Sequence, residues 1–246
     1  MPQHLDRARQ FAARLASLYG DELVSVGLYG SAARDQYREG ASDLNLLVIL
    51  RSVRPEELRR ASEAALEWVR EGNPPPLLFS EAEWRGSADV FPIEYSDIEQ
   101  AHLVLHGADP FTGLQVDWDH LRLLCEHEMK SKKLALRERY LLAAGTPEEL
   151  GALMTGSISS FVALFRAALR LTRAEVPREQ EAVVSAVAAR AGFDPAPMLR
   201  ALAARASGEG LVAGAEDPLV VGYLEGVDRA SAWLDGLARS RPEPGA

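Results

Sequence analysis

The sequence predicts an α+β fold, with a small mixed-sheet domain followed by an all-α helical bundle. Two aliphatic runs within residues 24–50 flank a glycine-serine corner and indicate neighbouring strands. Helical apolar spacing precedes and follows these runs, as expected for helices that pack on a sheet. In the C-terminal half no stretch alternates like a strand, so that half reads as helices only. The expected parts are a sheet domain at 1–117, a helical domain at 118–240 and a disordered tail at 241–246.

The N-terminal half alternates helices with strands. Apolar residues at helical spacing predict a helix over 5–19, and Pro55 begins a second helix that ends near Gly72. Ser80 and Glu83 have the spacing of a capping box and predict a short helix. Further strands are expected at 77–79, at 90–95, where Pro92 indicates an edge or irregular strand, and at 102–106.

Five helices are expected in the C-terminal half. Their start and stop signals are Asp-Pro pairs at 194–195 and 217–218 and a closing Gly192. The expected helices are 121–144, one that begins after Gly156 and Ser157, 178–190, one from Pro195 and one from Pro218.

Composition excludes several classes of protein. The 246 residues are 47% hydrophobic and 26% charged, which is typical of a globular chain. A formal net charge of −9 argues against extended, sequence-independent nucleic-acid binding, because such binding uses Lys and Arg to neutralise phosphates. The single cysteine cannot form an internal disulfide. No signal peptide or membrane-spanning run is apparent, so we expect a cytoplasmic protein without membrane contact.

The segment 30–49 carries the chemistry. Gly30 and Ser31 end a strand just before a helix start, where free backbone N–H groups and a hydroxyl suit a phosphate. In the second strand, side chains alternate between faces, so Asp43 and Asn45 share one face with Leu47 and Ile49. The residues expected on the other face are Leu44, Leu46, Val48 and Leu50. Oxygen ligands beside a phosphate corner are what Mg²⁺ bound to a nucleoside triphosphate requires.

The ordered set Gly30, Ser31, Asp43, Asn45 resembles the signature of the nucleotidyltransferase superfamily, which includes DNA polymerase beta and the aminoglycoside nucleotidyltransferases. Members carry two carboxylates at the last two positions, and this chain has an asparagine at the second. The resemblance implies that the Gly30 backbone and the Ser31 hydroxyl bind the phosphates, and that Asp43 and Asn45 hold Mg²⁺ or Mn²⁺. It also implies a C-terminal helical domain, with the acceptor bound in the cleft between the two domains.

Superfamily members use a third acid on a neighbouring strand as a metal ligand or as the base that activates the acceptor hydroxyl. By resemblance, Glu94 in the expected strand 90–95 takes this catalytic and metal-binding role. Asp97 is the alternative, and it would lie on the opposite face if the strand continued. Arg34, one helical turn after Ser31, is a further candidate for contact with the phosphates.

The expected function is transfer of a nucleoside monophosphate from a Mg²⁺–nucleoside triphosphate, ATP by default, to a hydroxyl of a small molecule, with release of pyrophosphate. Two alternatives remain open. One is a toxin–antitoxin type enzyme that modifies a partner protein. The other is a non-catalytic nucleotide-binding module, because Asn45 removes one negative charge from the metal site.

Overall fold

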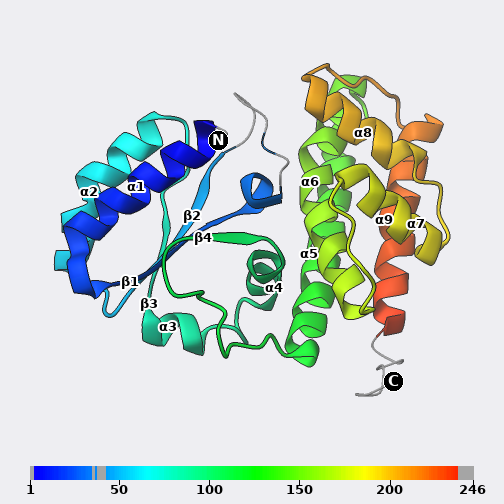
Figure 1. The fold of residues 1–246 in the computed structure, drawn as a ribbon. Coiled ribbons are helices and arrows are strands. Elements are labelled where there is room, and N and C mark those ends of the chain that lie inside the picture. Colours follow the sequence, from blue (N-terminus) through cyan, green and yellow to red (C-terminus); the bar gives the residue numbers. More distant parts are fainter. Residues whose placement is uncertain (1–2, 35–36, 38–42, 238–246) are drawn as a thin grey trace. The chain divides into compact units, whose positions relative to one another are not determined.

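The computed structural model of the 246-residue chain describes residues 3–34, 37 and 43–237. The chain divides into two compact units, Met1–Asp117 and Trp118–Ala246 (Figure 1). The expected tail at 241–246 lies outside the described residues.

The N-terminal unit is built on a mixed sheet. In the described part of the chain it has four strands in the order β3-β2-β1-β4. β1 pairs antiparallel with both β2 and β4, and β3 runs parallel to β2. The parallel step needs a crossover, which the helix α2 (Pro55–Arg70) supplies. The strands are β1 (Leu23–Tyr29), β2 (Asn45–Leu50), β3 (Leu77–Ser80) and β4 (His102–Gly107). The predicted α+β class is confirmed.

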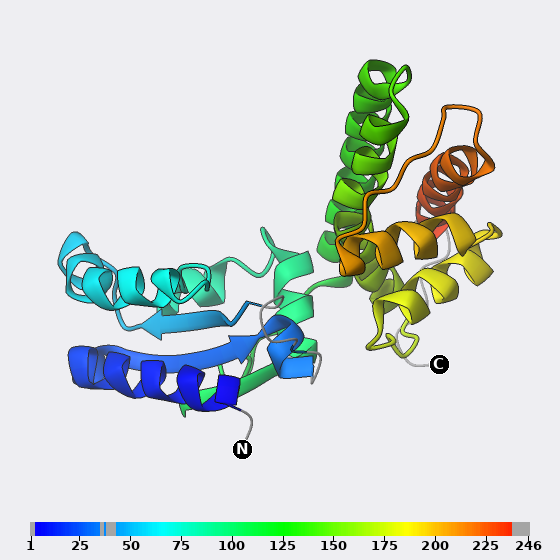
Figure 2. The same ribbon diagram turned by 90° about the horizontal axis from the view of Figure 1, so that it is seen from above.

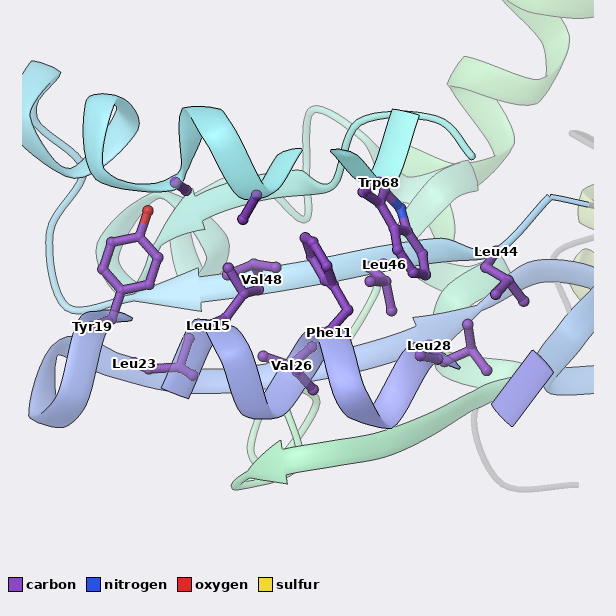
Figure 3. Packing of buried hydrophobic residues seen from close by; sticks show 14 of the residues in the cluster. Phe11, Leu15, Tyr19, Leu23, Val26, Leu28, Leu44, Leu46, Val48 and Trp68 are labelled. Carbon is purple, nitrogen blue, oxygen red and sulfur yellow. The ribbon is translucent and has the colours of Figure 1, made fainter. Parts of the chain in front are cut away.

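One face of the sheet packs against α2 and α1 (Gln3–Tyr19), which leads into β1 through the short 3-10 turn η1 (Gly20–Glu22). Figure 3 shows the side chains of this core filling the space between the helices and the strands. Phe11 of α1 lies against Trp68 of α2 with 4.6 Å between ring centroids. From β2 and the residue before it, this core takes Leu44, Leu46, Val48 and Leu50. The predicted alternation is therefore confirmed on this face.

The start of α2 is held by an ion pair. Arg54 donates from Nη2 to Glu57 Oε1 at 2.8 Å, and the Arg54 backbone N–H donates to Glu57 Oε2 at 3.0 Å. The Arg54 side-chain hydrogen bond, together with the backbone N–H groups and the guanidinium charge, lowers the pKa of Glu57 from 4.5 to about 2, against a smaller opposing effect of desolvation. Tyr19 joins α1 to the same helix, because its hydroxyl donates to the Glu57 carbonyl at 2.6 Å.

The other face of the sheet packs against two short helices, α3 (Glu81–Gly86) and α4 (Pro92–Gln100), and a following loop. Leu47 and Ile49 of β2 lie in this second core, so the alternation of β2 holds on both faces. The capping box that predicted α3 is present, since Ser80 accepts a hydrogen bond from the Glu83 N–H at 3.2 Å.

The expected strand at 90–95 is wrong, because this segment enters α4. Pro92 occupies the first turn of that helix, where its missing N–H costs nothing. The buried residues of α4 follow helical spacing and are Pro92, Tyr95, Ser96 and Ile98. Tyr95 stacks on Trp84 of α3 at 4.0 Å between ring centroids, which fixes the helix on the sheet. A short apolar run that contains a proline does not by itself distinguish an irregular strand from a short helix.

The second unit consists, in its described part, of five helices. They are α5 (Trp118–Ala143), α6 (Pro147–Leu171), α7 (Gln180–Ala191), α8 (Ala196–Ser207) and α9 (Pro218–Leu237). α6 starts nine residues before Gly156, earlier than the sequence indicated, because Thr146 and Pro147 already begin the helix. Figure 2 shows α5 and α6 side by side along their length.

Helix α6 is the central helix of this unit and contacts each of the other four. Its length and composition alone would allow it to cross a membrane, which corrects the expectation that no stretch of the chain would do so. However, 56% of its most apolar stretch is buried inside the unit. Its buried Arg166 donates to the carbonyls of Pro177 and Arg178 in the loop that precedes α7. These contacts are those of a core helix.

Candidate functional site

The Gly30 corner forms where β1 ends. The chain leaves the sheet after Tyr29 and enters η2 (Gly30–Arg34), a 3-10 helix of five residues. Gly30 has a φ of +81°, a left-handed conformation that favours glycine. The short helix expected here is thus a 3-10 helix of five residues, so its contribution to anion binding is a few local N–H groups and not the dipole of a long helix.

Asn45 lies directly against this corner. It is the first residue of β2 and pairs with Tyr29, the last residue of β1. A Cβ on Gly30 would lie 3.1 Å from Asn45 Nδ2, so the amide and the glycine backbone are neighbours. Asp43 precedes β2 and is exposed, whereas the side chain of Asn45 is half-buried. The structure therefore brings Asn45 and the Gly30 corner together, with Asp43 two residues away.

Helix α4 lies next to the Gly30 corner. Arg34 of η2 donates from Nη2 to Asp97 Oδ2 of α4 at 2.6 Å, and the Arg34 side chain is 11% exposed. Burial and the nearby Asp97 charge raise the pKa of Tyr29 at the end of β1. Glu94 is exposed on α4, one helical turn before Asp97. In a helix, residues three apart share a side, so Glu94 and Asp97 are neighbours and not on opposite faces as a strand would place them.

A residue that sequence reasoning missed holds the strand that follows Asp43. Asn73 is buried at the end of the α2 region, and its Oδ1 accepts a hydrogen bond from the Leu44 N–H at 3.1 Å. Gly72 before it has a φ of +90°, and prolines follow, so the sequence indicates a turn here. No local pattern indicates that this turn reaches Leu44.

Within residues 3–34, 37 and 43–237, no three His, Cys, Asp or Glu side chains gather as a metal site would require. Most of the segment between Ser31 and Asp43 lies outside that range. A surface pocket of about 430 Å³ is present in the helical unit, between α6 and the loop after α8, and none of the expected site residues lines it. The candidate site residues that the structure describes thus lie at the Gly30 corner, at the start of β2 and on α4.

Residues 8–98 match the nucleotidyltransferase domain family. Residues 8–98, within the N-terminal unit, form a nucleotidyltransferase domain. The match runs from α1 to α4 and so includes the Gly30 corner, Asp43, Asn45 and both acids of α4. The chain is accordingly an enzyme of nucleotidyl transfer, and the resemblance stated from Gly30, Ser31, Asp43 and Asn45 is confirmed.

Among solved structures, the chain is similar to the spectinomycin adenyltransferase AAD(9) from Enterococcus faecialis, crystallised with ATP and spectinomycin. The TM-score is 0.56 at 13% sequence identity, and the similarity covers 91% of this chain and 98% of that one. At this identity the likeness establishes a shared fold, in which helices follow the nucleotidyltransferase domain. A comparison with curated protein sequences finds none that matches this chain.

Proposed function

We propose that this enzyme transfers a nucleoside monophosphate from a Mg²⁺-bound nucleoside triphosphate, ATP in the first instance, to a hydroxyl of a small molecule and releases pyrophosphate. The observation that carries the proposal is the contact between the Gly30 corner and Asn45 inside a nucleotidyltransferase domain. We assign nucleotide binding to residues 1–117 and acceptor binding to the helical part, 118–240. A cytoplasmic location fits this use of ATP.

The phosphates bind at Gly30 and Ser31 in this proposal. The absence of a side chain at Gly30 lets a phosphate approach the backbone, and the 3-10 turn after it provides N–H groups that need acceptors. Arg34 lies at the end of the same turn, where its positive charge favours a triphosphate. Both hydrogen bonds from Arg34 to Asp97 use Nη2. In this proposal a phosphate would therefore be bound by the other guanidinium nitrogens, Nε and Nη1.

Asp43 and Asn45 are the residues that would hold the divalent cation. An exposed carboxylate and a half-buried amide beside a phosphate corner fit a hard cation that prefers oxygen ligands. When bound, Mg²⁺ or Mn²⁺ would neutralise phosphate charge and orient the triphosphate. The donor set carries one negative charge fewer than a pair of carboxylates, and we therefore expect weaker cation binding than two aspartates would give.

Glu94 is the base in this proposal. It is exposed on α4, while the carboxylate of the neighbouring Asp97 is already engaged by Arg34 at 2.6 Å. This difference in engagement favours Glu94. The acceptor oxygen forms a bond to the α-phosphorus, the bond from that phosphorus to pyrophosphate breaks, and the hydroxyl proton passes to Glu94. In the same proposal Glu94 is also a ligand of the cation.

The experiment is pyrophosphate release from ATP with Mg²⁺ or Mn²⁺, measured for the wild type and Asp43→Ala against pooled hydroxyl-bearing small molecules that include aminoglycosides. Asp43 is exposed, so its replacement leaves the core intact. Release that requires both the acceptor pool and Asp43 supports the proposal. Release with a cell lysate alone, together with a nucleotide-modified protein, indicates the protein-modifying alternative.

Asn45 favours one other candidate, a nucleotide-binding module without turnover. That candidate predicts that ATP binds and that no pyrophosphate appears with any acceptor. Asn45→Asp separates the two readings. A gain of release in this variant shows that the missing carboxylate limits the wild type, whereas a wild type already active without it removes the non-catalytic candidate.

A further inference from the structure

Leu44, between Asp43 and Asn45, lies outside the strand pairings of β2 in the described part of the chain. The pairing of β1 with β2 ends at Tyr29 and Asn45, and the pairing of β2 with β3 starts only at Leu47. Leu44 is fully buried, at 0% exposure, so its N–H needs a partner within the protein. Asn73 Oδ1 is that partner, at 3.1 Å.

Asn73 is itself fixed from the other side. Its Nδ2 donates to the Trp68 carbonyl at 3.3 Å, and its backbone N–H is directed at the same carbonyl at 3.4 Å. Only 6% of Asn73 is exposed, and the indole of Trp68 is packed in the core against Phe11. An amide is needed here, because the position uses both an acceptor, for Leu44, and a donor, for Trp68.

We propose that Asn73 is a positioning residue that holds the Leu44 peptide and thereby sets where Asp43 and Asn45 present their oxygens. The inference rests on the proposed function of Asp43 and Asn45 as cation ligands. Asp43 lies just before β2, and among the described residues the hydrogen bond of the Leu44 N–H to Asn73 fixes the backbone directly after it. Residues that orient metal ligands in this way commonly change metal affinity about 10- to 100-fold when replaced.

The test compares three variants. Asn73→Ala removes both hydrogen bonds, and Asn73→Asp keeps an oxygen that can accept from Leu44 while it loses the donor to Trp68. Tyr19→Phe is the matched control, because it removes one buried hydrogen bond to a backbone carbonyl in the same core, 2.6 Å from donor to acceptor, that involves neither Leu44 nor Asn73. Each protein is measured for hydrogen exchange of the Leu44 amide without metal or nucleotide, and for Mn²⁺–ATP binding by titration.

In Asn73→Ala we expect loss of Leu44 amide protection and a rise of about tenfold or more in the Mn²⁺–ATP dissociation constant. Asn73→Asp retains the protection. Tyr19→Phe, although it too is destabilised, retains protection of the Leu44 amide and leaves the Mn²⁺–ATP dissociation constant within about twofold of the wild type. Protection of Leu44 in Asn73→Ala, or a binding loss no larger than in Tyr19→Phe, overturns the proposal.

The two proposals fail in distinguishable ways. A wild type that binds no Mn²⁺–ATP overturns the proposed function, and with it the ligand-positioning role of Asn73. The exchange measurement on the metal-free protein still decides in that case whether Asn73 anchors Leu44. A wild type that binds Mn²⁺–ATP as tightly as Asn73→Ala overturns the positioning role alone.

Discussion

Replacing Gly30 by alanine tests the geometry of the phosphate corner. The substitution has two effects, because it places an alanine in a left-handed conformation and adds a methyl group next to Asn45. Substitutions at two other glycines allow these effects to be measured separately. Gly20 has a positive φ of +55° with nothing within 4 Å of an added Cβ, and Gly27 has neither a positive φ nor a neighbour within 4 Å. At Gly30 the φ is +81°, and the added Cβ lies 3.1 Å from Asn45 Nδ2, which is closer than ordinary van der Waals contact.

The expected magnitudes follow from these values. A left-handed alanine costs about 1–2 kcal/mol, which is the expected loss of unfolding free energy in Gly20→Ala. Gly27→Ala is expected to be neutral or to stabilise by about 0.5 kcal/mol, because it only restricts the unfolded chain. Gly30→Ala carries the same left-handed cost and in addition pushes the Asn45 amide a few tenths of an ångström. Its unfolding free energy therefore falls by about 1–3 kcal/mol, and its ATP affinity falls with it.

The assay is urea unfolding monitored through the hydrogen exchange of peptides from β1 and β2. These peptides report on the N-terminal unit separately from the C-terminal helical unit. ATP affinity is measured on the same samples. The reasoning is refuted if Gly30→Ala is as stable as Gly27→Ala, since the left-handed conformation would then not be present. The proposed binding of phosphate at Gly30 is refuted if Gly30→Ala and Gly20→Ala bind ATP equally well.

Three further predictions concern contacts elsewhere in the chain. An added Cβ on Gly151 of α6 would lie 1.5 Å from a backbone oxygen of the loop after α8. Gly151→Ala should therefore destabilise the protein by about 1–3 kcal/mol in thermal unfolding. The control, Gly156→Ala, has nothing within 4 Å of the added Cβ and should be neutral or stabilising. A double-mutant cycle of Arg34→Met and Asp97→Asn should give a coupling free energy of about 1 kcal/mol in urea unfolding, and a coupling near zero would show that the pair is absent in solution. The pKa of Glu57 is lowered to about 2 by the guanidinium that caps α2, so its stabilising effect is complete above pH 4.5 and is lost as the pH falls toward 2. Glu57→Gln should consequently flatten the acid limb of the stability curve, and parallel wild-type and variant curves between these pH values would contradict the assignment.

The sequence by itself determined the class of fold and predicted the region of the candidate site. Alternation in β2 predicted which residues face each core, and Leu47 and Ile49 do lie on the face opposite to Leu46 and Val48. The capping box at Ser80 and the glycine-serine corner are also local signals, and both appear at the expected places. Such features are readable because each depends on residues within a few positions of one another.

The tertiary structure decided how that site is supported. The segment around Glu94 is a helix because Tyr95 and Ile98 bury one side of it against Trp84 and the sheet, which no local pattern specified. Arg34 meets Asp97 across 63 positions of sequence, and Asn73 meets Leu44 across 29. Contacts of this kind form only when separate elements pack together, since packing and not sequence spacing sets which polar groups are buried side by side and must satisfy one another.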